Sequence, residues 1–241
     1  MQKKVRVYAD DGVSRVCLPH VLHMFGDWDV STIDAAAIID GAWMSDADVI
    51  CIPGGASIPY ARKLNGTGNG NIREFVAAGG AYFGICAGAY YGANRIEFDR
   101  GKPSEIIGEH ELKFFSGSAI GPAFGQFDGR TYRHVTFSDN ILSLGNGDRR
   151  VNLMFYGGPY FDGIKSGDGF SVLATYAETG QPSIIHGKCG SGTVILSGAH
   201  LSIDEKLFTA NTNRHLRTLA VPLSATANVR RMLMENIFAM L

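Results

Sequence analysis

The sequence predicts an α/β fold in which a doubly wound, mainly parallel sheet is covered by helices on both faces. In the first third of the chain, apolar runs long enough for buried strands alternate with stretches of helical periodicity, the pattern of β-α-β-α-β units with right-handed crossovers. A content of 45% apolar and 19% charged residues fits a globular protein with a large core. At 241 residues, the chain is expected to form one domain over residues 1–241.

The N-terminal third supplies the predicted elements in order. A helix over residues 14–26 has apolar residues at helical spacing despite Pro19 near its start, and a helix over 71–80 is closed by glycine. Continuously apolar or alternating runs that end in turn signals predict strands. The predicted strands cover residues 5–12, 28–34, 47–55 and 81–85.

In the rest of the chain, a region of short predicted strands is followed by apolar runs like those of the N-terminal third. Short strands with glycine and aspartate turns predict an antiparallel insert between about Glu97 and Asp148. Residues 182–200 hold two apolar runs joined by a Lys-Cys-Gly-Ser-Gly turn, which predicts a hairpin. Residues 228–241 predict a closing amphipathic helix.

Composition excludes several classes of partner and site. The net charge is -1, so we expect no nucleic-acid partner. No apolar run approaches about 18 residues and the apolar alternation begins by Val5, so neither a membrane span nor a signal peptide is expected. The four cysteines form no CxxC pair, which argues against a zinc or redox site and favours a cytoplasmic location. We expect no cofactor and no metal, including at Asp10 and Asp11.

The stretch GGAYFGICAGAYYG places Cys86 between small residues, where a predicted strand meets a predicted helix over 87–94. This setting is typical of a nucleophile elbow, a strained strand-to-helix turn that needs small neighbours. Free N–H groups at a helix N-terminus favour a thiolate and would lower the pKa of the Cys86 thiol. The alternative is a small buried cysteine in a glycine-rich turn.

A cysteine nucleophile needs a base and an oxyanion hole. Among seven histidines, His200 follows an apolar strand and is expected at the carboxyl edge of the sheet, where open α/β sheets place their sites. The Pro53-Gly54-Gly55 turn could aim an N–H inward to join that of Ala87.

Two further local patterns have competing interpretations. The GTGNG stretch, residues 66–70, resembles a phosphate loop only loosely and is interpreted as a turn. Four tyrosines could line a pocket near the elbow, and core packing is the equal alternative for them. These are Tyr60, Tyr90, Tyr91 and Tyr156.

Four motifs in one order carry a family resemblance: PGGASIPYARKLNGTGN, GICAGAYYGANRIEF, ELKFFSGSAIGPAF and VILSGAH. Together they resemble the amino-terminal domain of eukaryotic-type biotin–protein ligases and its stand-alone bacterial relatives. That family belongs to the class I glutamine amidotransferase-like superfamily, so the resemblance implies a flavodoxin-like fold. It also implies Cys86 as nucleophile, His200 as base, and Gly55 with Ala87 as oxyanion donors.

The chain departs from the superfamily pattern at two places. Tyr90 stands where amidotransferases usually carry a substrate-binding glutamine, so glutamine is not the expected substrate. The usual His-Pro-Glu is His-Leu-Ser here, which leaves Asp204 or Glu205 as candidates to orient His200. The Gly-Arg-Gly-Arg type loop of the ligase catalytic domain is absent from this sequence, so no ligase activity is expected of it.

Two functions remain open from the sequence. One is a cysteine-dependent amidase or amidotransferase-like hydrolase that acts through a Cys86/His200 dyad on an unidentified small-molecule or amide substrate. The other is a non-catalytic ligand-binding or regulatory module, which could have another protein as its partner.

Overall fold

The computed structural model describes residues 2–125, 133–139 and 149–241. Its largest element is a nine-stranded sheet in which the first five strands in spatial order run parallel and the others join antiparallel. The order of the parallel strands is that of flavodoxin-like folds. In spatial order the strands are β2 (Asp29–Ile33), β1 (Lys4–Tyr8), β3 (Val49–Ile52), β4 (Ala81–Ile85), β13 (Gly192–Ser197), β12 (Pro182–Cys189), β11 (Phe170–Tyr176), β8 (Arg133–Asp139) and β9 (Arg149–Phe155). The predicted doubly wound, mainly parallel sheet is confirmed.

Strand β3 shows why its sequence is apolar throughout. Val49 and Cys51 belong to one hydrophobic cluster and Ile50 and Ile52 to another, because alternate side chains of a strand point to opposite faces of the sheet. All four are fully buried. A strand covered on both faces therefore reads as a continuous apolar run.

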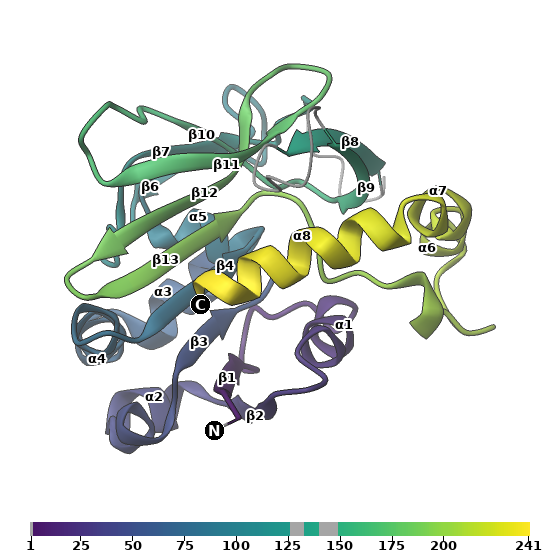
Figure 1. Cartoon of the computed structure of the whole chain (residues 1–241). Coiled ribbons are helices and arrows are strands. Elements are labelled where there is room, and N and C mark those ends of the chain that lie inside the picture. The colour runs from purple at the N-terminus through teal and green to yellow at the C-terminus, as the bar shows by residue number, and fades with distance from the viewer. Residues whose placement is uncertain (1, 126–132, 140–148) are drawn as a thin grey trace.

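Helices cover both faces of the parallel part of the sheet (Figure 1). Helices α1 (Cys17–Met24) and α8 (Ala227–Met240) share one cluster, where the rings of Phe25 and Phe238 stack at 5.2 Å. Other helices contribute to the opposite cluster. They are α2 (Ala35–Asp40), the 3-10 helix η1 (Ala42–Asp46), α3 (Ser57–Leu64), α4 (Thr67–Ala77) and α5 (Ala87–Gly92).

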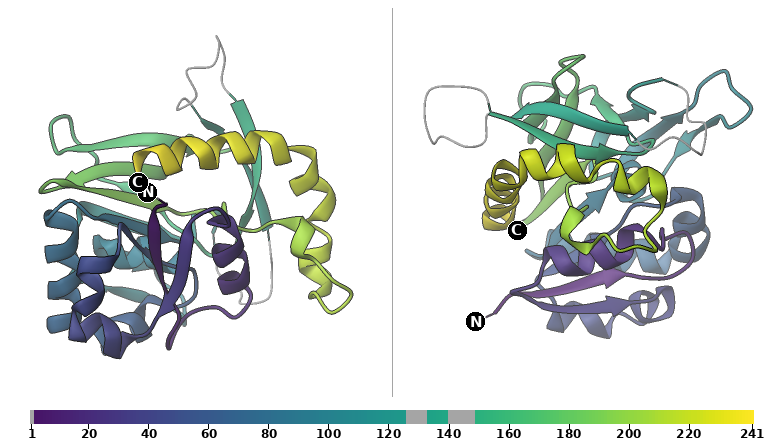
Figure 2. Two further views of the ribbon diagram at one scale, coloured as in Figure 1. Left: turned by 60° about the horizontal axis from the view of Figure 1, so that its bottom comes forward. Right: turned by 90° about the vertical axis from the view of Figure 1, so that its right-hand side faces the viewer.

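A second, four-stranded sheet packs into the cluster of α5. Its strands in spatial order are β10 (Tyr160–Asp162), β7 (Phe115–Gly121), β5 (Ala93–Phe98) and β6 (Ile106–Glu109). Strand β5 follows α5 directly. Strands β5 and β6 of this sheet form the outer wall of the site described below. Figure 2 shows these later strands on one side of the molecule and the N-terminal β-α units on the other.

The extension differs from the single antiparallel insert predicted between about Glu97 and Asp148. Strands β5 and β7 pair in parallel, and the second sheet begins at Ala93 and includes β10, beyond the expected end. Strands β8 and β9 instead extend the main sheet. Part of the predicted insert lies outside the described residues.

The interpretation of residues 66–70 as a turn is wrong, because residues 67–70 form the first helical turn of α4. The amide of Gly66 donates to the carboxylate of Glu111 at 2.7 Å, and the Asn69 side chain donates to the same oxygen at 3.0 Å. The carboxylate of Glu111, a residue of the chain itself, therefore occupies the position that a bound anion would take at a helix N-terminus.

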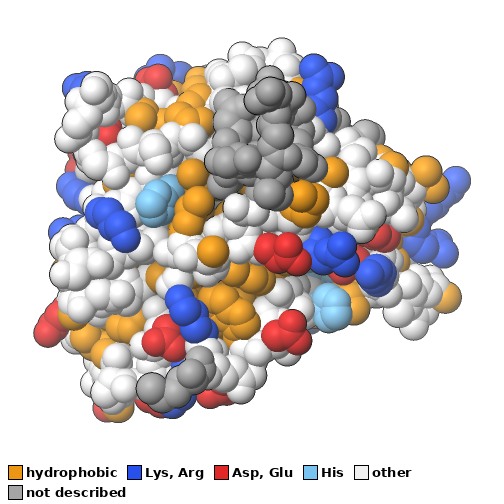
Figure 3. Space-filling view, in the orientation of Figure 1, with side chains coloured by type: hydrophobic (Ala, Val, Ile, Leu, Met, Phe, Trp, Pro, Cys, Tyr) orange, Lys and Arg blue, Asp and Glu red, His pale blue; other side chains and the backbone are white. Residues whose placement is uncertain are grey.

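The C-terminal segment runs along the outside of the sheet. It contains the 3-10 helix η2 (Glu205–Leu207) and the helices α6 (Arg214–Arg217) and α7 (Ala220–Ala225) before α8. On the face that carries α8, acidic and basic side chains are interspersed (Figure 3). Among the described helices, none has both the length and the apolar character needed to cross a bilayer.

Candidate functional site

Cys86 adopts the strained conformation of an elbow between β4 and α5. Its φ is 51° and its ψ is -102°, a backbone region that non-glycine residues rarely occupy. A Cβ built on Gly84 would overlap the carbonyl of Gly88, and one built on Gly88 would overlap the carbonyl of Ile52. The glycines that flank the cysteine are thus required by the close approach of the backbone.

The Cys86 thiol is buried and neutral. The residue is 5% exposed, and its Sγ donates a long hydrogen bond to the carbonyl of Tyr156 at 3.6 Å. Burial raises the pKa of the Cys86 thiol, the nearby Cys17 raises it further, and the amide of Ala87 lowers it by too little to compensate. The expected lowering of this pKa by the helix N-terminus is therefore outweighed by desolvation.

His200 follows β13, as expected, but does not hydrogen-bond to Cys86. Its amide donates to the carbonyl of Met154 at 2.9 Å, and its Nδ1 lies 3.6 Å from the Sγ of Cys17. Its Nε2 is buried and has no hydrogen-bond partner among the described residues. Burial, with a smaller contribution from His20, lowers the pKa of His200 to about 4, so the ring is neutral at pH 7.

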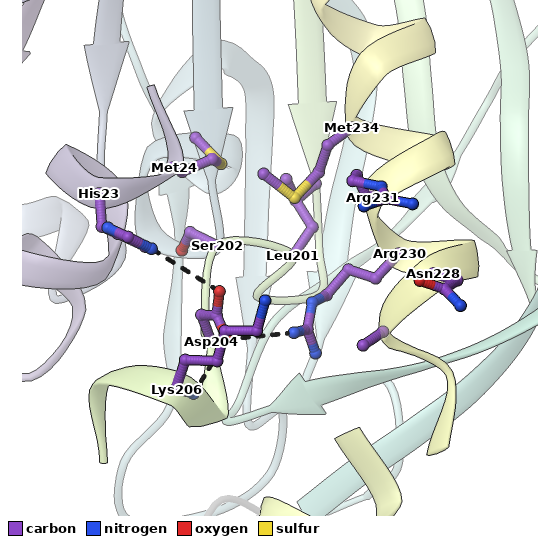
Figure 4. A pocket seen from close by; sticks show the side chains of 11 residues that line it. His23, Met24, Leu201, Ser202, Asp204, Lys206, Asn228, Arg230, Arg231 and Met234 are labelled. Carbon is purple, nitrogen blue, oxygen red and sulfur yellow. Dashed lines mark hydrogen bonds and ion pairs between the residues drawn. The ribbon is translucent and has the colours of Figure 1, made fainter. Parts of the chain in front are cut away.

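The two carboxylates predicted to orient His200 form ion pairs with Arg230 in the structure. Glu205 Oε2 lies 2.6 Å and Asp204 Oδ1 lies 3.4 Å from Nη2 of the buried Arg230. Asp204 also faces His23, with 3.8 Å between its Oδ2 and the imidazole Nε2 (Figure 4). The reason is geometric: the loop after His200 turns toward α8, and Arg230 on that helix is a stronger partner for both acids.

Of the two predicted oxyanion donors, Ala87 follows Cys86 directly in the chain and Gly55 lines the same pocket. The amide of Gly55 has no acceptor among the described residues, and a Cβ at this position would overlap the carbonyl of Gly12. The amide of Ala87 interacts with the Cys86 sulfur. The amide of Gly88 donates to the carbonyl of Pro53 at 3.2 Å, which ties the elbow to the Pro-Gly-Gly turn.

Cys86, Gly55 and Ala87 all line one pocket of about 450 Å³. The pocket lies between the elbow, the start of α3 and the second sheet, and His200 is not part of its wall. The wall is largely apolar and contains no ionisable side chain apart from the thiol and two tyrosines. The lining residues are Gly55, Ala56, Ser57, Ile58, Cys86, Ala87, Tyr90, Ile96, Phe98, Ser104, Ile106, Tyr156 and Gly157.

The four candidate pocket tyrosines divide into two pairs. Tyr90 and Tyr156 line the pocket, and the Tyr90 hydroxyl donates to the carbonyl of Gly157 at 2.9 Å. Tyr60 and Tyr91 do not line it but pack edge-on against each other, with ring centroids 5.8 Å apart. Their hydroxyls donate inside the core, so for this pair core packing replaces the predicted pocket role.

Sequence reasoning missed two features of the site. Cys17, on the first turn of α1, contacts His200 because the loop after β1 and the loop after β13 meet at the carboxyl edge of the sheet. The second feature is the apolar wall from β5 and β6, formed by Ile96, Phe98 and Ile106. Cys17 begins α1 several residues after the end of β1, whereas Cys86 follows β4 directly, so no local signal pointed to Cys17.

The carboxylate of Asp10, in the loop after β1, accepts hydrogen bonds from the backbone. Asp10 accepts the amides of Asp11 and Ala35 at 2.6 and 3.1 Å. Among the residues that the structure describes, no group of three or more His, Cys, Asp or Glu is arranged to hold a metal ion.

Comparison with known proteins identifies the family of this elbow-bearing fold. Residues 3–241 match the family described as "Biotin-protein ligase, N terminal". The chain belongs to this family. The resemblance predicted from the four sequence motifs is thereby confirmed.

Relatives of this biotin–protein ligase N-terminal family member include an uncharacterized protein of Chlamydia muridarum, 31% identical over 83% of this chain and 80% of that protein. The biotin–protein ligase of Schizosaccharomyces pombe is 30% identical over 81% of this chain, which spans only 33% of the yeast protein. A glutamine amidotransferase of Thermotoga maritima has a similar fold, with a TM-score of 0.55, 11% identity, and coverage of 99% of this chain and 97% of that one. The family member thus has a glutamine amidotransferase-like fold.

Proposed function

We propose that this protein binds a small molecule in the pocket beside Cys86 and that Cys86 and His200 do not form a working dyad in the free protein. The proposal rests on the observation that the Cys86 and His200 side chains have different partners. Cys86 lines a 450 Å³ pocket and donates to Tyr156, whereas the His200 ring contacts Cys17 and is not part of that pocket.

The protonation states support binding over turnover. Burial raises the pKa of Cys86 and lowers the pKa of His200 to about 4. Moving the thiol proton to this imidazole is therefore unfavourable by several orders of magnitude, at a factor of ten for each unit of difference. A dyad that starts as two neutral, separately bonded groups lacks the activated thiolate that cysteine catalysis uses.

The test is ligand-observed NMR with a mixture of small neutral organic fragments. We expect saturation-transfer signals with the wild-type protein and with Cys86→Ala, because the wall and not the thiol provides most of the contact area. Ala56→Trp, at the exposed rim of the pocket, should abolish these signals by filling the entrance. Ala36→Trp, an equally exposed change on α2, is the matched control. Signals that survive Ala56→Trp would contradict the proposed site.

A second candidate is a cysteine-dependent amide hydrolase, and the elbow itself favours it. A positive φ at a cysteine costs on the order of 1 to 3 kcal/mol and is typical of functional sites. The amide of Ala87 already faces the sulfur, and the amide of Gly55 is without an acceptor in the described chain. A bound substrate would then have to exclude water and bring His200 away from Cys17.

Turnover separates the two candidates. A panel of acyl p-nitroanilides, followed by nitroaniline release, should show no rate above that of Cys86→Ala if the protein only binds. A wild-type rate that falls at least about 100-fold in both Cys86→Ala and His200→Ala would favour the hydrolase.

A further inference from the structure

We propose that the Cys86 pocket selects an uncharged, largely apolar acyl group with a carbonyl at its Cys86 end, and that it rejects free amino acids such as glutamine. This inference rests on the proposed function, because it names the chemical class of the ligand for that same pocket.

The wall of the pocket is apolar and without charged side chains. Ile58, Ile96, Phe98 and Ile106 line the pocket, and none of its lining residues is Asp, Glu, Lys, Arg or His. An α-amino acid carries an ammonium and a carboxylate, and each would lose its hydration without a charged partner. The transfer of an apolar chain into this wall is favourable instead, at about 25 cal/mol per Å² removed from water.

Two polar side chains of the wall already have hydrogen-bond partners. The Tyr90 hydroxyl donates to the carbonyl of Gly157, and the Ser104 hydroxyl donates to the carboxylate of Asp99. Asp99 is 4% exposed and does not line the pocket. Neither hydroxyl proton is therefore free for an anionic group of a ligand.

Backbone donors are available at the Cys86 end of the pocket. The Ala87 amide interacts with the Cys86 sulfur, and the Gly55 amide, which lines the same pocket, has no acceptor among the described residues; we propose that the two amides receive one carbonyl oxygen. The volume of about 450 Å³ falls within the range of pockets that enclose small organic ligands. A neutral amide or ester with an apolar tail matches both ends of this pocket.

The experiment uses three chloroacetamide probes with the same reactive group and different tails: N-hexyl, N-(5-carboxypentyl) and N-(6-aminohexyl). In the reaction, the cysteine sulfur forms a bond to the methylene carbon as the carbon–chlorine bond breaks; chloride leaves and the thiol proton passes to the buffer. Mass spectrometry of digested protein gives the labelling rate at each cysteine. Cys189 is partly exposed and does not line the pocket, so it serves as an internal reference for probe reactivity.

We expect the ratio of the Cys86 rate to the Cys189 rate to be at least about tenfold higher for the hexyl probe than for either charged probe. Ile106→Lys should raise the ratio of the Cys86 rate to the Cys189 rate for the carboxylate probe, because the lysine adds a cation to the wall. Ile107→Lys is the matched control, since Ile107 is the next residue on β6, 40% exposed, and outside the pocket.

The outcomes distinguish this inference from the proposed function. Equal Cys86-to-Cys189 ratios for all three probes would overturn the apolar selectivity while leaving an accessible pocket. A carboxylate or ammonium probe that labels Cys86 fastest would overturn it as well. Failure of every probe to label Cys86, in a folded protein whose Cys86 is labelled by iodoacetamide at the same pH, would contradict the pocket and with it the proposed function.

Discussion

The Sγ of Cys17 lies 3.6 Å from Nδ1 of His200, so a thiol and not a carboxylate is the partner of this imidazole. Burial raises the pKa of Cys17 to about 11, so Cys17 is a neutral thiol at pH 7 and can donate its proton to Nδ1. We expect Nδ1 to accept this proton, which places the ring proton on Nε2. A ring in this form cannot accept a proton at Nε2, which is why Cys17 opposes a role for His200 as a base through that atom.

The first prediction concerns this tautomer. We expect long-range ¹H–¹⁵N NMR spectra at pH 7 to show His200 in the Nε2–H form, since Cys17 donates to Nδ1. Cys17→Ala should reduce the preference for this form. A dominant Nδ1–H form in the wild-type protein would show that the hydrogen bond runs in the opposite direction and that Nε2 is free to act as a base.

The second prediction is a pH dependence of stability that arises from His200. In the unfolded chain a histidine takes up a proton near pH 6.5, whereas in the folded protein burial lowers the pKa of His200 to about 4. The unfolded state therefore binds more protons between these values, and the free energy of unfolding falls as the pH drops from 6.5 to 4. The contribution is on the order of 3 kcal/mol at most and is fully present above pH 6.5.

Urea unfolding at several pH values checks this dependence. His200→Gln should reduce the slope of stability against pH between 6.5 and 4. His215→Gln, which removes an exposed imidazole, is the control. A slope unchanged by His200→Gln would refute the assigned pKa.

The third prediction concerns the glycines of the elbow. Gly88→Ala should destabilise the fold by about 3 kcal/mol or more, since the added Cβ would overlap the carbonyl of Ile52. Gly70→Ala is the matched control on α4, where the added Cβ meets nothing within 4 Å and should stabilise the helix by up to about 1 kcal/mol. Thermal unfolding measures both; a tolerated Gly88→Ala would mean that the elbow is less tightly packed than described.

The fourth prediction concerns the ion pairs that hold the loop after His200. Arg230→Ala should destabilise the protein by about 3 kcal/mol, because the Arg230 side chain is 6% exposed and its loss leaves Glu205 without its cation. Arg231→Ala removes an exposed arginine from the same helix and should cost less than about 0.5 kcal/mol. Equal effects of the two changes in chemical denaturation would argue against an anchoring role for Arg230.

Much of the fold could be predicted from the sequence because its signals are local. The strand of residues 81–85 was predicted with its observed limits, since an apolar run between two glycine turns leaves little choice of boundaries. A turn was predicted at residues 66–70 because glycine lowers helix propensity, and this prediction was wrong. The contact of Gly66 with Glu111 that supports the start of this helix comes from a segment distant in sequence.

In the site, too, features that depend on local sequence differ from features that depend on distant segments. The elbow at Cys86 was visible from its small neighbours, but the partner of His200 depends on where distant loops meet. Asp204 lies close to His200 in sequence and is drawn away by Arg230 on α8, while Cys17 is distant in sequence and adjacent in space. Sequence proximity was therefore the wrong criterion for choosing the orienting group.

The pH dependence of Cys86 alkylation by iodoacetamide reports whether the thiol in the pocket is activated. Burial raises the pKa of Cys86 above its ordinary value, so we expect a labelling rate that is still rising with pH at about pH 9 and a pH profile that His200→Ala leaves unchanged in shape. A rate that reaches a plateau with an apparent pKa below about 7.5, and that loses this plateau in His200→Ala, would contradict the account and establish a working Cys86/His200 dyad.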